Sequence, residues 1–111
     1  MAGSKEMMGA ATGLLVLGIL SRGPNYGYEI VRTVNDEAQG LLVWQEGTLY
    51  PVLHKLEKQG LVRAQWQEAD SGRERKYYYI SAAGRAALRQ DVRQWHAVND
   101  LILRLAGARH A

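Results

Sequence analysis

Basic side chains crowd one short segment of the chain, where they could bind an anionic polymer. Arg73, Arg75 and Lys76 come directly after residues 70–72, whose sequence Asp-Ser-Gly is typical of a turn. Cations on a projecting loop can straddle phosphates or enter a minor groove. Charges on a hairpin also deter edge-to-edge strand pairing, and Glu74 reduces the local positive field. Three cations within four residues favour phosphate binding.

A second group of polar side chains comes from residues 46–58. Leu49, Leu53 and Leu56 recur at helical spacing, so they share one face and leave the other free. A helix that enters a DNA major groove needs small or polar residues in its first turn and donors on its outer face. The outward residues that fit are Gly47, Thr48, Tyr50, Pro51, His54, Lys55 and Lys58. An ordinary solvated helix is the alternative, and the hairpin that follows shifts the balance toward DNA.

The rest of the sequence predicts the elements that position these residues. Apolar periodicity and Gly or Pro breaks predict helices over residues 5–21, 26–38, 46–58 and 82–106. Strands over 61–67 and 74–80, joined by a polar turn, form a hairpin wing. Asn25 and Ser81 are the expected N-caps of the second and last helices. In the first helix, Gly9, Gly13 and Gly18 indicate close helix contacts.

These elements predict a mainly α fold with a small β-hairpin (α+β), a winged helix-turn-helix with a C-terminal dimerisation helix. Residues 1–80 form the DNA-binding domain and residues 81–111 the dimerisation helix of one compact unit. A chain of 111 residues builds a small core, so an apolar helix seam gains from a second copy. That seam comprises Leu88, Val92, Trp95, Val98, Ile102 and Leu105.

Composition excludes several other classes of protein. The chain has no cysteine, and its three histidines are too scattered to bind a metal, so we expect neither a disulfide nor a metal site. The sequence contains no motif that pairs a nucleophile with a base and no pair of carboxylates typical of an active site. We therefore expect neither an enzyme nor a cofactor. The longest apolar run is too short to span a bilayer and no secretory signal is evident, so we expect a cytoplasmic protein without membrane contact. The net charge of +3 is concentrated in residues 85–111 and is weak evidence for nucleic acid.

Two aromatic features have alternative interpretations. Tyr77 and Tyr79 alternate with Tyr78 and Ile80 on a strand, and core packing is favoured over a stacking platform for single-stranded nucleic acid. Trp95 could form aromatic walls around a flat ligand between two subunits, although a packed interface tryptophan is favoured. Asn99, one turn further on, could set helix register or bind a ligand.

With these elements in place, the sequence resembles the PadR family of bacterial transcriptional regulators over nearly its whole length. The matching segments are residues 21–30 (SRGPNYGYEI), 46–51 (EGTLYP), 56–58 (LEK), 60–61 (GL), 72–73 (GR), 75–78 (RKYY) and 83–84 (AG). The resemblance implies a homodimeric repressor that binds double-stranded DNA at a palindromic operator. The implied DNA-binding residues are Thr48, Tyr50, Pro51, His54, Lys55, Lys58, Arg73, Arg75 and Lys76.

The short C-terminal part is similar to compact, multidrug-sensing members of the family. The resemblance implies a pore between subunits in which paired tryptophans hold a flat aromatic compound, lined here by Met7, Leu14, Leu17, Asp91, Trp95 and Asn99. Gly13 stands where those proteins carry a polar residue, and Asp91 replaces a small one, which predicts preference for cationic ligands. The competing hypothesis is a winged-helix module that binds proteins without sequence-specific DNA binding.

Overall fold

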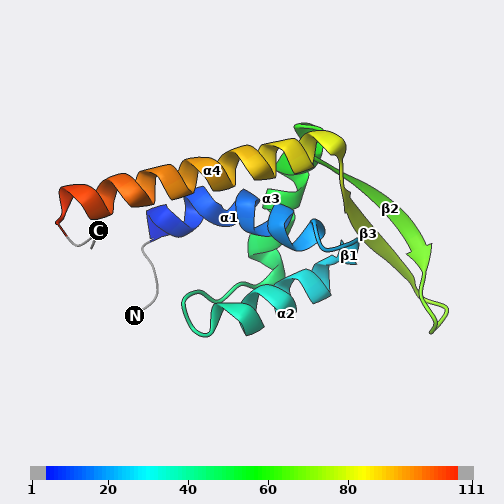
Figure 1. Cartoon of the computed structure of the whole chain (residues 1–111). Helices are drawn as coiled ribbons and strands as arrows, with labels where there is room; N and C mark the ends of the chain where they lie inside the picture. Colours follow the sequence, from blue (N-terminus) through cyan, green and yellow to red (C-terminus); the bar gives the residue numbers. More distant parts are fainter. Residues whose placement is uncertain (1–4, 108–111) are drawn as a thin grey trace.

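The computed structural model describes residues 5–107, with side chains described from residue 9 onward. In chain order the elements are α1 (Lys5–Leu20), β1 (Asn25–Tyr26), α2 (Gly27–Ala38), α3 (Glu46–Lys58), β2 (Val62–Glu68), β3 (Glu74–Ile80) and α4 (Ala82–Leu105) (Figure 1). The α+β winged-helix prediction is confirmed, and the predicted bounds of the helices and hairpin strands agree with the observed ones to within one residue. Helical and strand periodicity therefore determined most of the elements.

The core forms where α1, α2 and α3 pack together. Leu49, Leu53 and Leu56 of α3 are buried, as their spacing predicts. Ile30 and Val34 of α2 are buried against them, also as predicted. Each such aliphatic side chain contributes about 1.5–3 kcal/mol by leaving water. The inner face of α3 is therefore fixed, and its outer face is left for solvent or a partner.

The tyrosine run on β3 follows the predicted alternation. Tyr78 is only 1% exposed and belongs to the core, and Ile80 packs against the same core. Tyr77 and Tyr79 point to the other face and are half-buried. The Tyr79 hydroxyl accepts a hydrogen bond from the side-chain amide of Gln67 on β2. Core packing of the Tyr78 face is thus confirmed.

Asn25 has a different role from the one predicted. It does not cap α2, whose N-cap is Tyr26 without a side-chain hydrogen bond. Instead, Asn25 and Tyr26 form the short strand β1, which pairs antiparallel with Tyr78 and Tyr77 of β3. The Asn25 side-chain oxygen accepts a hydrogen bond from the backbone N–H of Tyr26 at 2.9 Å. The strand order is β1-β3-β2, because β1 satisfies backbone groups that would otherwise lie on an open edge of β3.

The hairpin of β2 and β3 projects from the helical body as a wing (Figure 1). Val62 pairs with Ile80 near the body and Glu68 with Glu74 near the tip, in an unbroken antiparallel register. Gly72 turns the chain with a φ of 84°, a conformation that favours glycine. The predicted turn therefore places the cations that follow it on the outer half of the wing.

The long helix α4 begins directly after the wing and lies along α1 (Figure 1). The Ser81 hydroxyl oxygen accepts a hydrogen bond from the Gly84 N–H at 3.0 Å, which confirms the predicted N-cap. A Cβ on Gly84 would lie 2.1 Å from the carbonyl oxygen of Leu61, so only glycine fits at this contact. Among residues 5–107, neither α4 nor any other helix is long and apolar enough to cross a membrane.

The glycines of α1 only partly fit the prediction of close helix contacts. A Cβ on Gly13 would lie 3.6 Å from the Leu56 side chain, an ordinary packing distance. A Cβ on Gly9 or Gly18 would have no neighbouring atom within 4 Å. The prediction is wrong for these two within a single chain, because the chain itself brings no other helix against them.

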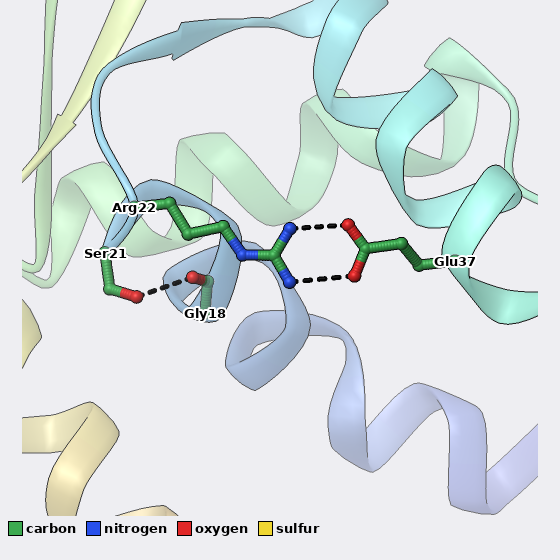
Figure 2. Close-up of polar contacts among 4 residues, drawn as sticks. All are labelled: Gly18, Ser21, Arg22 and Glu37. Atoms are coloured by element: carbon green, nitrogen blue, oxygen red, sulfur yellow. Dashed lines mark hydrogen bonds and ion pairs between the residues drawn. The ribbon is translucent and has the colours of Figure 1, made fainter.

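Polar contacts fasten the junction between α1 and α2 (Figure 2). The Arg22 guanidinium donates to both carboxylate oxygens of Glu37, at 2.5 and 2.8 Å, and the Ser21 hydroxyl donates to the Gly18 carbonyl at 2.6 Å. The hydrogen bonds from Arg22 hold the pKa of Glu37 below its ordinary value. Because both partners are exposed, the pair orients the junction more than it stabilises it.

Candidate nucleic-acid interface

The outer face of α3 carries the side chains expected to read DNA. All six of them are exposed, namely Thr48, Tyr50, Pro51, His54, Lys55 and Lys58. The helix begins at Glu46, whose carboxylate in the first turn suits the positive end of the helix dipole. It ends after Lys58, where Gly60 has a φ of 74°. The apolar inner face is buried, so these polar residues form the side available to a partner.

These six residues do not all share one surface, because they are spread around α3. His54 and Lys58 lie on its outermost ridge and form a shallow hollow with Glu57. Pro51 and Lys55 face a hollow shared with α1 and α4. Tyr50, on the opposite flank, faces the wing. A DNA duplex that contacts the ridge would therefore have the hollow shared with α1 and α4 on one side and the hollow beside the wing on the other.

Aromatic rings hold two of the three wing cations. The Arg75 guanidinium carbon lies 4.5 Å from the centre of the Tyr26 ring, and the Lys76 ammonium lies 5.7 Å from that of Tyr78. Arg73, nearest the turn, is exposed. Cation–π contacts restrict the conformations of Arg75 and Lys76, so less entropy is lost when they bind an anion. The wing therefore presents ordered positive charge.

A groove of about 530 Å³ separates the wing from the N-terminal ends of α2 and α3. It is lined by Tyr26, Gly27, Tyr28, Glu46, Tyr50, Trp66, Arg73, Glu74, Arg75, Lys76 and Tyr78. We call it the wing groove. It brings Tyr50 of α3 together with the three predicted wing cations. Apart from Thr48, which lines none of these hollows, the predicted DNA-binding residues thus fall into the ridge of α3, the α1–α4 side of α3, and the wing groove.

One wall of the wing groove depends on a close contact between α2 and α3. A Cβ on Gly27 would lie 2.6 Å from the Tyr50 hydroxyl oxygen, so glycine is required for the tyrosine to lie there. The Tyr50 hydroxyl donates a long hydrogen bond of 3.4 Å to the Glu46 carboxylate. Burial raises the pKa of Tyr50, and the negative charge of Glu46 raises it further. The phenol therefore stays protonated and remains a hydrogen-bond donor at neutral pH.

Sequence reasoning missed the aromatic residues of the wing groove. Trp66 and Tyr28 line it and are 62% and 59% exposed, and neither was predicted to bind DNA. The strand pattern contained a signal for Trp66. Val62, Ala64 and Trp66, every second residue of β2, lie on the strand face that packs against the body. Trp66 is the last of them and lies beyond the part of the strand that contacts the core. Tyr28 carried no such signal, since only the tertiary fold places it opposite the wing.

A second hollow, of about 390 Å³, lies between α1, α3 and α4. Its lining includes Leu14, Leu17, Asp91 and Trp95, four of the six residues expected to line a ligand pore. Asn99 lines a neighbouring hollow together with Leu14 and Trp95. Met7 lies in α1, but its side chain is outside the described part of the structure. The fold thus brings together five of the predicted pore residues along one side of α4.

The outer half of α4 exposes the apolar seam predicted for dimerisation. Leu88 packs against the core, while the residues beyond it turn increasingly to solvent. The exposed apolar residues of this half are Val92, Trp95, Val98, Leu101, Ile102 and Leu105. A contiguous apolar surface of this kind marks an interaction site. Among the side chains of residues 9–107, no group of three or more from His, Asp and Glu could hold a metal ion.

Comparison with protein families matches this arrangement to known regulators. The model of the transcriptional regulator PadR-like family matches residues 16–90, which include α3 and the whole wing. A protein of Lysinibacillus sphaericus is 32% identical over 88 residues, covering 79% of this chain and 81% of that protein. The match to the family model spans more than half of the chain.

Solved structures share the same arrangement of elements. A transcriptional regulator from Clostridium thermocellum superposes with a TM-score of 0.84 at 27% identity, covering 93% of this chain and 97% of that one. A PadR family transcriptional regulator from Eggerthella lenta superposes with a TM-score of 0.80 at 34% identity, covering 94% of this chain and 88% of that one. Both coverages include most of α4 as well as the wing.

Proposed function

This chain belongs to the PadR-like family of transcriptional regulators, and we propose that it acts as a homodimeric repressor of a palindromic DNA operator. Regulators of this family are DNA-binding proteins and not enzymes. In this proposal, residues 1–80 bind DNA in the cytoplasm and residues 81–111 join two subunits. Helix α3 reads the major groove, and the wing binds the flanking backbone.

The observation that carries the proposal is the pairing of an exposed polar ridge on α3 with a cluster of cations on the wing. His54 and Lys58 can reach base edges or phosphates from the ridge. Arg73 and Lys76 line the wing side of the wing groove, where they can bind the backbone of the same duplex. A winged helix binds DNA through these two parts together, which makes duplex DNA the best-supported partner.

The exposed seam of α4 supports the dimer. Val98, Ile102 and Leu105 remain in water in a single chain, and pairing with the α4 of a second subunit would cover them. A two-fold axis at α4 would present two copies of α3 on the same side of the dimer. To grip a palindrome, those copies must lie about one DNA turn apart, roughly 34 Å.

The hollow around Trp95 supports a small planar ligand as the signal that releases DNA. Trp95 offers an aromatic face and Asp91 a negative charge, which together suit a flat cation. Pro51 and Lys55 of α3 line the same hollow, so an occupant would contact the DNA-reading helix directly. Such a ligand acts only through different affinities for the DNA-competent and DNA-incompetent states.

Selection of bound sequences from random duplex DNA at a stated salt concentration tests the main proposal. We expect a palindrome with half-sites one helical turn apart. Lys58→Ala and Arg73→Ala should each weaken binding and reduce the slope of log K against log salt by about one. Arg89→Ala removes an exposed cation from α4 and serves as the matched control. Equal affinity in all four proteins would favour a protein-interaction module.

The dimer and the ligand have separate tests. Sedimentation at micromolar concentration should give twice the chain mass, and a single-chain mass would contradict the dimer. A planar cationic dye should quench tryptophan fluorescence in the native protein but much less in Trp95→Phe. Quenching by planar anions instead would contradict the role given to Asp91.

A further inference from the structure

Trp66 is a large apolar side chain placed in water on the wing. It is 62% exposed, although it lies on the strand face whose earlier residues, Val62 and Ala64, pack against the body. Leaving an indole in water forgoes much of the stabilisation that burial would give. Its exposure leaves an aromatic face available to a partner outside the chain.

The neighbours of Trp66 define the chemistry of that partner. Lys76 is the cross-strand partner of Trp66, so the two side chains project from the same face of the wing. Across the wing groove lies Tyr28, another exposed aromatic side chain, at the start of α2. The groove thus has an aromatic side chain on each wall. A molecule that fills it must present apolar surface to both walls.

The charges in the wing groove require the same molecule to be anionic. Arg73, Arg75 and Lys76 line it from the wing, against only two carboxylates, those of Glu46 and Glu74. Lys76 lies on the same strand face as Trp66 and Tyr78, and its contact with the Tyr78 ring holds its ammonium on the groove side of the wing. A DNA strand meets both requirements, since charged phosphates alternate with deoxyribose rings whose carbon atoms are apolar. The groove also adjoins the exposed face of α3, so one duplex can occupy both.

We infer that the wing groove holds one backbone strand of the operator, with Trp66 and Tyr28 packed on deoxyribose rings and the wing cations on the phosphates beside them. This inference rests on the proposed function and adds to it two residues that bind DNA by apolar contact. Trp66 is the main apolar contact because it is the larger side chain. The aromatic contacts release no counterions, so they add affinity that salt does not weaken.

Salt dependence separates the aromatic contacts from the ionic ones. Trp66→Ala should weaken duplex binding about tenfold, equivalent to about 1.4 kcal/mol, at every salt concentration, with the slope of log K against log salt unchanged. Arg73→Ala should instead lower the slope by about one. Trp66→Phe should keep most of the affinity, because a phenyl ring still covers a sugar. Val43→Ala shortens an apolar residue that is even more exposed, on the loop before α3, and should bind as the native protein does.

Circular dichroism of each variant ensures that a folded protein is compared, and Trp66→Phe provides the answer if Trp66→Ala does not fold. Fluorescence gives an independent measurement. Duplex DNA should change the emission of the native protein by an amount that Trp66→Phe loses, since Trp44 is buried and Trp95 lies on α4. An unchanged affinity for Trp66→Ala, or the same emission change in Trp66→Phe, would overturn the inference.

Failure of the inference can be told apart from failure of the proposed function. If the native protein binds a selected duplex but Trp66→Ala binds it equally well, only the occupant of the wing groove is wrong. If the native protein binds no duplex at all, the proposed function is wrong and the inference fails with it. A response of Trp66 emission to small aromatic anions but not to duplex would also overturn the inference.

Discussion

Helices α3 and α4 carry equally regular apolar faces, but the chain covers only one of them. Leu49, Leu53 and Leu56 of α3 lie in the core, whereas Ile102 and Leu105 of α4 are 57% and 78% exposed. The spacing of apolar residues is similar in the two helices. Periodicity therefore predicts that a helix has a face to bury, and the tertiary fold decides whether the same chain or a second molecule buries it.

Shortening the buried face should have the largest effect. Leu53→Ala removes a fully buried side chain and should lower the free energy of unfolding by about 2–5 kcal/mol, measured in urea. Leu101→Ala removes the same atoms from the exposed side of α4 and is the matched control. At protein concentrations where single chains dominate, its unfolding should hardly change. Equal losses in the two variants would contradict the contrast between the helices.

A charged residue on the exposed apolar face of α4 tests whether a second subunit covers that face. Ile102→Asp should weaken the proposed dimer about a hundredfold, equivalent to about 2.7 kcal/mol, because it would bury a carboxylate from each subunit. The helical content of the single chain should stay the same, since the side chain is exposed there. Sedimentation measures the dimer, and circular dichroism the fold. Retention of the native molecular mass would show that this face lies outside any interface.

The first turn of α4 contrasts with its outer half, because it is fixed to the body. Gly84→Ala would place a methyl group against the Leu61 carbonyl and should lower the free energy of unfolding by about 1–3 kcal/mol. Gly18→Ala makes the same change in α1, where the new methyl group meets no atom within 4 Å. It should raise stability by about 0.5–1 kcal/mol through its better helix propensity. Thermal melts measure both changes, and a stabilised Gly84→Ala or a destabilised Gly18→Ala would contradict this contrast.

The smallest effect should come from a contact that lies wholly in solvent. The hydrogen bonds from Arg22 lower the folded-state pKa of Glu37 below its ordinary value of 4.5. Their stabilisation is therefore complete above pH 4.5 and is lost as the pH falls through the lower pKa of the folded state. Glu37→Gln should have a slightly lower melting temperature than the native protein at pH 7 in low salt. The two melting curves should converge in strong acid, and a difference that persists there would refute this account.

Most of the fold could be predicted because its elements have strong local signals. Leucine spacing determined α3, alternation determined β2 and β3, and Ser81 marked the start of α4. The strand β1 could not be predicted, since its two residues are too few to show a period and exist as a strand only beside β3. Asn25 is of a residue type that often caps helices, but pairing with β3 places it in a strand instead.

The candidate site was predictable in its ionic parts and not in its aromatic ones. Lys58 and Arg73 follow from local patterns, and the structure exposes both. Trp66 and Tyr28 come together only through the tertiary fold, because one belongs to the wing and the other to α2. A role of each of these four residues in binding DNA stays a prediction.

A short, hydrogen-bonded connection joins the wing, which is proposed to bind DNA, to α4, which is proposed to bind a second subunit. Ser81 alone separates β3 from α4, its hydroxyl donates to the Gly60 carbonyl at 2.7 Å, and its N–H donates to the Leu61 carbonyl at 3.0 Å. A tilt of α4 about this point cannot be absorbed by a slack linker. We therefore expect a tilt of α4 either to strain these hydrogen bonds or to be passed on to β3, the strand that leads directly into it.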